Sequence, residues 1–102
     1  HESLRQIQTF AFKGCVNLKT FAFEIGNLGN VISYGESAFE NCSSLTKMII
    51  PSSIDNRDNT RTVGNNCFTG CSSLTIYSYS RAFNSTSTNK DQWALNVPIV
   101  DR

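Results

Sequence analysis

The chain has 102 residues, of which 39% are hydrophobic and 17% are charged, and its formal net charge is +1. This length suffices for one small domain, and the composition argues against a disordered chain and against a nucleic-acid-binding protein, which usually carries a marked basic excess. The longest apolar run has three residues, far fewer than the roughly 20 of a membrane-spanning helix. The first residues, His1-Glu2-Ser3, show no signal-peptide pattern, so composition leaves a cytosolic and an extracellular setting open.

An eight-residue motif recurs three times along the chain, at residues 11–18, 38–45 and 67–74. Each copy has alanine or cysteine, then phenylalanine, with cysteine and leucine three and six positions after the phenylalanine. The phenylalanines lie 27 and 29 residues apart, a spacing typical of solenoid repeats, whose copies must stack to bury their apolar sides. An apolar residue, followed by glycine in two of the three copies, stands five positions before each phenylalanine: Ile7, Tyr34-Gly35 and Val63-Gly64.

Two kinds of short element are predicted in each copy. The Phe-x-x-Cys-x-x-Leu segment predicts a short helical turn, because positions three apart share one face of a helix. The leucine that ends the motif begins an LxxLxL-like pattern, which predicts a half-buried strand lying parallel to the strands of its neighbours. We expect the following strand side chains to point inward: Leu18, Phe21 and Phe23; Leu45, Met48 and Ile50; Leu74, Tyr77 and Tyr79.

Three of the four cysteines, Cys15, Cys42 and Cys71, occupy one column of the repeat. We therefore expect an inward ladder of free, buried thiols, since a free buried cysteine behaves as a small hydrophobic residue. Cys67 replaces the alanine of the other copies and is expected in the core as well. A Cys67–Cys71 disulfide or a metal site is the alternative, although a metal needs several converging ligands and the one histidine lies at the terminus.

These residues resemble a known family. The Ala-Phe-x-x-Cys-x-x-Leu pattern, the apolar-Gly pair before it and the Ile-Pro-Ser-Ser-Ile segment at 50–54 are similar to the BspA-type leucine-rich repeats over about residues 4–79, whereas residues 55–61 look like a polar insertion. The resemblance implies a leucine-rich-repeat solenoid of short parallel β-strands and short helical turns, in a right-handed stack of about three repeats plus a C-terminal cap. It also implies an extracellular or cell-surface protein, because family members are typically surface proteins of mucosal bacteria and protozoa, often implicated in adhesion.

We expect the chain to divide into a series of repeats and a C-terminal cap. A solenoid must cover its last apolar rung, and the family often carries a tryptophan in a short tail, similar to Trp93 here. The N-terminal side shows no such cover, and an uncovered edge of the stack is a template for association. The predicted division is repeats at about 1–23, 24–50 and 51–79, which together fill 1–79, and a cap over 80–102.

Outward positions of the predicted strands are the usual ligand surface of leucine-rich solenoids. Among them, Ala22, Ile49 and Ile76 would form an apolar stripe flanked by lysines, which suits protein recognition. Surface residues scattered on a short sheet are the alternative. The candidate partner-binding residues are Lys19, Thr20, Ala22, Thr46, Lys47, Ile49, Thr75, Ile76 and Ser78.

Other kinds of site find little support in the sequence. Of the two sequons, the one at Asn41 lies inside the repeat motif, and Asn84, in a polar stretch, is the candidate glycosylation site. The insertion at 55–61 lacks the closing glutamate of a calcium loop, so a solvated loop is predicted. No catalytic triad, Cys–His pair or phosphate-binding glycine loop is visible. We therefore predict no catalytic residue, no cofactor and no metal, and we do not expect an enzyme.

Two functions fit these patterns. The leading hypothesis is a protein-interaction module that acts in cell-surface adhesion or ligand binding through the solenoid face. Its partner would be a host matrix or cell-surface protein, with neither nucleic-acid binding nor membrane insertion. The alternative is a structural subunit that assembles end to end with further copies of itself. A third hypothesis is a truncated fragment with no function of its own.

Overall fold

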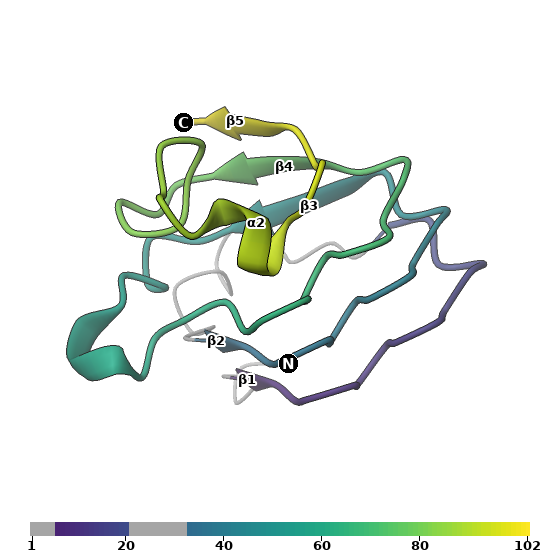
Figure 1. The fold of residues 1–102 in the computed structure, drawn as a ribbon, viewed down its shortest axis with the longest axis horizontal. Helices are drawn as coiled ribbons and strands as arrows, with labels where there is room; N and C mark the ends of the chain where they lie inside the picture. The colour runs from purple at the N-terminus through teal and green to yellow at the C-terminus, as the bar shows by residue number, and fades with distance from the viewer. Residues whose placement is uncertain (1–5, 21–32) are drawn as a thin grey trace.

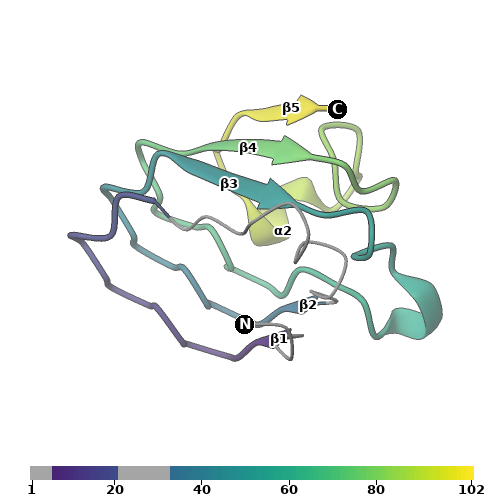
Figure 2. The same ribbon diagram turned by 180° about the vertical axis from the view of Figure 1, so that it is seen from behind.

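The computed structural model describes residues 6–20 and 33–102, and in these residues the chain coils between two parallel sheets (Figures 1 and 2). The smaller sheet has the order β1-β2 and the larger one the order β3-β4-β5. All of the strand pairings are parallel, so the predicted short parallel strands are confirmed. In chain order the elements are β1 (Gln6–Ile7), β2 (Ser33–Tyr34), β3 (Lys47–Ile50), the 3₁₀-helix η1 (Arg57–Asn59), β4 (Thr75–Ser78), α2 (Lys90–Trp93) and β5 (Ile99–Asp101).

Isolated bridges extend both sheets by one further rung. Tyr34 of β2 pairs with Val63, and Lys47 of β3 pairs with Thr20. Each copy of the repeat therefore contributes one short extended segment to each sheet. Two residues predicted to point inward from the first strand, Phe21 and Phe23, lie outside the described residues.

The segments that join the two sheets are zigzags of turns, which run side by side in Figure 1. The predicted helical turns are wrong at these positions, because the described helices are η1 and α2 only. Backbone N–H groups alternate in their use: that of Ala38 donates within its own turn to Gly35 (3.2 Å), and that of Phe39 donates to Cys67 of the next copy (2.9 Å). In a helix successive N–H groups point along the axis toward residues of the same segment, so N–H groups that donate sideways to the next copy exclude one here.

Left-handed backbone conformations recur at two equivalent places in each zigzag. The second place holds Gly14, Asn41 and Gly70, with φ values of 75°, 63° and 83°. Glycine and asparagine are the residues that adopt this conformation at low cost. The repeat therefore has glycine or asparagine before its cysteine because the turn at that point requires a positive φ.

The core is a column of aromatic rings that runs through the stack. Phe39 lies between Phe12 and Phe68, with ring centroids 5.3 and 5.6 Å away and planes inclined by 8°. Tyr34 meets Phe39 and Phe68 edge-on at 6.0 Å, and its hydroxyl donates a hydrogen bond of 2.6 Å to the carbonyl of Ile49. Each such ring pair contributes about 0.5–1.5 kcal/mol beyond the burial of apolar area.

The cysteine column lies inward, as predicted, and all four thiols are free. Cys42, Cys67 and Cys71 are buried, and Cys15 in the first copy is half-buried. The thiol of Cys42 donates to the carbonyl of Phe12 (3.1 Å), and that of Cys71 donates to the carbonyl of Phe39 (3.0 Å). These two thiols thus each bind the phenylalanine carbonyl of the preceding copy.

The glycine of the apolar-Gly pair permits neighbouring copies to approach closely. A Cβ atom on Gly35 would lie 2.5 Å from the backbone nitrogen of Thr9, and one on Gly64 would lie 2.5 Å from that of Glu36. Both distances are shorter than any real Cβ contact. These two positions exclude every larger residue at the present separation of the copies.

The C-terminal segment packs on the third copy of the repeat. Carbonyls at the end of α2 accept hydrogen bonds from the last zigzag: Gln92 from Asn66 (2.6 Å) and Trp93 from Phe68 (2.9 Å). Trp93 is buried and meets Phe83 edge-on at 5.6 Å. A short helix has unsatisfied carbonyls at its C-terminus. Here these carbonyls accept the hydrogen bonds that a further copy of the repeat would otherwise accept from the last zigzag.

Candidate functional site

The outward face of the β3-β4-β5 sheet is set by which strand residues point inward. In β3, Met48 and Ile50 are buried as predicted, whereas Lys47 is exposed and Ile49 half-buried. Met48 pairs with Ile76 of β4, and Ile50 pairs with Ser78. The inward side of β4 is therefore formed by Ile76 and Ser78.

This register corrects the prediction for the third strand. Tyr77 and Tyr79 point outward, with Tyr77 half-buried and Tyr79 49% exposed, while Ile76 is fully buried and Ser78 is 1% exposed. The third copy reaches its strand one residue sooner than the second, since Met48 pairs with Ile76 and not with Tyr77. Isoleucine suits a dry core better than tyrosine, whose hydroxyl needs a partner when it is buried.

Ser78 occupies an inward position because its polar group is satisfied there. Its hydroxyl donates a hydrogen bond of 2.5 Å to the carbonyl of Phe83 and accepts one from the N–H of Ser80 (3.1 Å). A buried hydroxyl costs free energy only when it lacks such partners. The hydroxyl thereby holds the chain that leaves β4 against the core.

The structure separates the nine predicted partner-binding residues into four groups. Ala22 lies outside the described residues, and Ile76 and Ser78 are buried, so their predicted exposure is wrong. Ile49 and Thr75 are half-buried. The remaining four are exposed: Lys19, Thr20, Thr46 and Lys47.

An apolar row crosses the outward face, but its members differ from the predicted stripe. Ile49 of β3 pairs with Tyr77 of β4, which pairs with Val100 of β5. Val100 is 40% exposed. Of the two described members of the predicted stripe, Ile49 belongs to this row and Ile76 does not, because the shift of register replaces Ile76 by Tyr77.

A shallow groove of about 210 Å³ lies on the outward face. It is lined by Lys47, Ile49, Tyr77, Tyr79 and Arg102. The ammonium of Lys47 lies over the ring of Tyr77, 5.2 Å from its centroid. Sequence reasoning missed Tyr77, Tyr79 and Arg102; the alternation Leu74-x-Ile76-x-Ser78, which places the tyrosines outward, is the signal that could have found the first two.

A family model described as BspA type leucine rich repeat region (6 copies) matches residues 1–90. The chain belongs to the BspA-type leucine-rich repeat family. No curated protein and no solved structure gave a significant match. The BspA-like family is typically surface-associated and generally non-enzymatic, and leucine-rich repeat domains typically mediate protein–protein binding.

The titratable groups in the core of this BspA-type chain are neutral. Burial raises the pKa of the Cys42, Cys67 and Cys71 thiols, that of Cys71 to about 12. A neutral thiol is a poor nucleophile and a poor metal ligand. Among residues 6–20 and 33–102, no group of three or more histidine, cysteine, aspartate or glutamate side chains is arranged to hold a metal ion.

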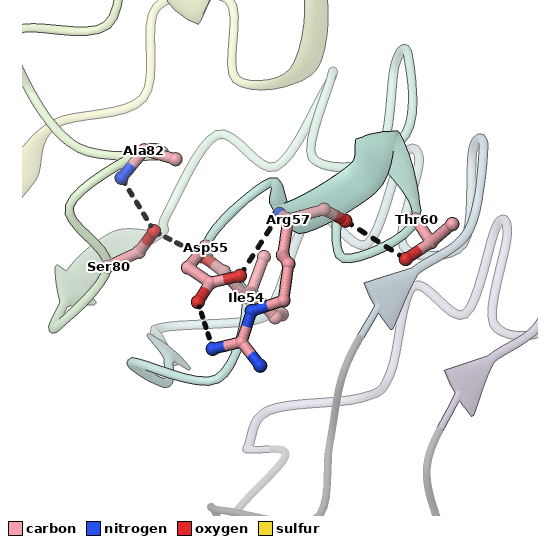
Figure 3. A network of polar contacts seen from close by, with 6 residues as sticks. All are labelled: Ile54, Asp55, Arg57, Thr60, Ser80 and Ala82. Carbon is pink, nitrogen blue, oxygen red and sulfur yellow. Dashed lines mark hydrogen bonds and ion pairs between the residues drawn. The ribbon is translucent and has the colours of Figure 1, made fainter.

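Hydrogen bonds within the insertion at 55–61 close it as a loop, and Ile54, just before it, is bonded to the segment after β4 (Figure 3). Asp55 accepts hydrogen bonds from the backbone N–H and the guanidinium of Arg57, at 3.1 and 2.9 Å. Partial burial opposes ionisation, but these contacts and the charge of Arg57 hold the pKa of Asp55 below its usual value. The hydroxyl of Ser80 donates to the carbonyl of Ile54 and accepts from the N–H of Ala82.

The sequon at Asn84 lies in the polar loop that precedes α2. The amide nitrogen of Asn84 donates to the carbonyl of Ser80 (3.0 Å), and its amide oxygen accepts from the N–H and hydroxyl of Thr86, at 2.9 and 2.6 Å. The amide thus closes the loop on itself. Glycosylation of Asn84 stays a prediction. The amide nitrogen that would carry the sugar is the one that donates to Ser80.

No helix in the described part of the chain has the length and apolar character needed to cross a bilayer.

Proposed function

We propose that this chain is a non-enzymatic protein-binding module that contacts its partner through the outward face of the β3-β4-β5 sheet. The observation that carries the proposal is the row of Ile49, Tyr77 and Val100 with Tyr79 beside it, all on the side of the sheet away from the core. Tyrosine and arginine are the residues most enriched in protein interfaces. A contiguous apolar and aromatic patch rimmed by cations suits a protein partner better than a small molecule.

A photocrosslinking experiment tests this face directly. The photoreactive residue p-benzoylphenylalanine replaces Tyr77, and in a control variant it replaces Leu95, which is 45% exposed but lies beyond α2 and outside the sheet. Each variant is irradiated with a panel of purified matrix and cell-surface proteins. Saturable crosslinks from position 77 alone are expected. Absence of crosslinks, or equal crosslinking from both positions, would contradict the proposal.

We further propose that the module acts at the cell surface, in adhesion to a matrix or cell-surface protein. Support comes from the family, which is typically surface-associated. Treatment of intact source cells with a protease that does not enter them is the test. Loss of the protein from intact cells is expected, and protection until the cells are lysed would contradict a surface location.

The structural part of the proposal is a right-handed stack of about three repeats, at 1–23, 24–50 and 51–79, closed by a cap over residues 80–102. The supporting observation is the use of the last zigzag's N–H groups by Gln92 and Trp93. Replacing Trp93 by alanine removes a large buried side chain, and we expect a loss of about 3–5 kcal/mol of unfolding free energy. Urea denaturation measures it, and an unchanged midpoint would contradict the capping role.

A second candidate function is end-to-end self-assembly, and one observation favours it. The carbonyls of Thr9, Ala11 and Lys13 accept no hydrogen bond from any residue that the structure describes, whereas the equivalent carbonyls of Glu36 and Ala38 accept bonds from the preceding copy. A row of backbone acceptors without partners among the described residues is a template for pairing.

Gln8 opposes self-assembly at this edge. Gln8 follows Ile7 in the first copy, at the position that Gly35 holds after Tyr34 in the second. A Cβ atom at Gly35 would collide with the backbone of the preceding copy, so the Cβ atom of Gln8 would collide in the same way with a copy added before it. Light scattering after size exclusion, over a wide range of concentration, decides between the two functions. We expect a monomer, whereas a mass that grows with concentration would establish the assembling subunit. A Gln8→Gly variant removes the obstruction and is the form in which association should first be seen.

A further inference from the structure

The charged side chains that line the groove on the outward face are all cationic. Lys47 and Arg102 line it and no acidic residue does. The two described ion pairs are elsewhere, between Lys13 and Glu40 and between Arg57 and Asp55. No ion pair therefore joins Lys47 or Arg102 to any residue that the structure describes.

The charge is local and does not follow from a general basic excess, because the whole chain has a formal net charge of only +1. The nearest acid along the chain from Arg102 is Asp101, whose carboxylate accepts hydrogen bonds from the N–H and the hydroxyl of Ser85, at 2.9 and 2.5 Å. These bonds hold the pKa of Asp101 below its usual value and direct the carboxylate toward the 84–87 loop. Among the described residues, neither cation of the groove thus has an acidic partner, and both are placed to meet an outside anion.

Two tyrosines and an isoleucine lie between the two cations of the groove. Tyr77 of β4 and Tyr79, which directly follows β4, point to the same side, and Ile49 of β3 lies beside Tyr77. Lys47 extends across from β3 to the Tyr77 ring, and Arg102 follows β5 on the opposite side of β4, where its N–H donates to the carbonyl of Ser78 (2.8 Å). The cations therefore flank the tyrosine row from both sides.

We infer that this groove binds an extended acidic peptide segment, in which two carboxylates flank one aromatic or aliphatic side chain. This inference rests on the proposed function and names the chemistry of the partner. Alternate residues of an extended peptide face the same side, about 6.5–7 Å apart. A segment with acids at its first and fifth positions and an apolar residue at its third complements the groove. Its two acids would face Lys47 and Arg102, and its apolar side chain would face the tyrosines between them.

A single-stranded nucleic acid is the other polymer whose groups could stack on tyrosine and pair with cations. The observations favour the peptide, because nucleic-acid affinity depends on neutralising many phosphates, and this groove has two cations. A peptide with one carboxylate on each side of an apolar side chain needs no more than two cations.

The test is a titration of the ¹⁵N-labelled chain, followed by NMR, with the peptide Thr-Glu-Thr-Tyr-Thr-Glu-Thr up to millimolar concentration. Its counterpart with glutamine in place of both glutamates has the same shape and no carboxylate side chains. We expect saturable shifts at the amides of β4 and its neighbours, and roughly tenfold weaker binding of the glutamine peptide. Added salt should weaken binding of the acidic peptide more than that of its counterpart.

Matched variants locate the effect. Lys47→Gln and Arg102→Gln should each weaken binding of the acidic peptide by about two- to fivefold, as expected for exposed charge pairs. Arg81→Gln changes the net charge equally at an exposed residue outside the groove and should leave the affinity unchanged. Unaltered melting temperatures show that the variants are folded.

Three results would overturn the inference: equal binding of the two peptides, shifts that saturate away from the groove, or tighter binding of an oligothymidylate than of the acidic peptide. An acidic peptide that shows no shift at millimolar concentration overturns it as well. Crosslinks from position 77 to a protein partner, obtained alongside such a result, would leave the protein-binding function standing. Failure of both experiments would remove the function and the inference together.

Discussion

Tyr34 joins the two sheets through a hydrogen bond from its buried hydroxyl. Its ring is 1% exposed, and its hydroxyl donates to the carbonyl of Ile49 at 2.6 Å. Tyr34→Phe keeps the ring contacts and removes this bond, so we expect a loss of about 1 kcal/mol of unfolding free energy, or a fall of roughly 5 °C in the melting temperature. Tyr77→Phe, on the outward face, is the control and should change stability by less than about 0.5 kcal/mol. Equal effects of the two substitutions would show that the Ile49 contact contributes nothing.

Individual core residues could be predicted from the sequence because each one aligns with an equivalent residue in the two other copies of the repeat. The phenylalanine and cysteine columns could be predicted, and Phe39, Phe68, Cys42 and Cys71 are buried. The hydrogen bonds of the thiols to the phenylalanine carbonyls of the preceding copy could not. They depend on the distance between copies, which no single repeat specifies.

Neighbouring copies of the repeat approach so closely because glycine follows the inward residue of the smaller sheet. In a Gly64→Ala variant the new Cβ would meet the backbone of Glu36 at 2.5 Å, and backbone cannot move aside as a side chain can. We expect a loss of about 3 kcal/mol or more, since overpacking forces the two copies apart.

Gly14→Ala separates this steric effect from backbone strain. A Cβ atom there meets nothing within 4 Å, but the residue has a φ of 75°, so only the left-handed conformation is penalised, by about 1–2 kcal/mol. Guanidinium denaturation of both variants makes the comparison. Should Gly14→Ala prove the more damaging, close packing of the copies would not be the reason for Gly64.

The strands show where an element could not be predicted from the pattern. A fixed offset between copies places Tyr77 and Tyr79 inward, and the structure instead buries Ile76 and Ser78. The offset changes by one residue within the third copy, and a one-residue change reverses every side chain of a strand. The outward face of the sheet could therefore be predicted as a candidate binding surface, but the residues that line its groove could not. Likewise the sequence predicts a cap over residues 80–102 but no strand at β5, because Ile99 and Val100 are too short a segment to show the alternation of a strand.

At the scale of the whole molecule, the buried thiols and Tyr34 make stability depend on pH in the alkaline range. Burial raises the pKa of Cys42, Cys67, Cys71 and Tyr34 above their unfolded values. Above about pH 9 the unfolded chain loses thiol protons that the folded chain retains, so the unfolded state binds fewer protons and the unfolding free energy falls as pH rises. Below that pH these groups are protonated in both the folded and the unfolded chain, so their contribution to the unfolding free energy is fully present.

We therefore expect urea midpoints that are level near neutral pH and fall from about pH 9 upward, with the fully buried Cys67 alone contributing a slope of up to about 1.4 kcal/mol per pH unit. The chain itself supplies the matched control, because Cys67 stands where the other two copies have Ala11 and Ala38. Cys67→Ala should fold normally and show a shallower alkaline decline than the parent, since one retained proton is removed from the balance. Midpoints that stay level to pH 10.5 would mean that the thiols ionise as readily in the folded chain as in the unfolded one. A Cys67→Ala variant as sensitive as the parent would mean the same of Cys67 alone. The first result would imply that the buried cysteines are open to solvent, and the tight stacking of the copies on which the sheet and its outward face depend would not hold.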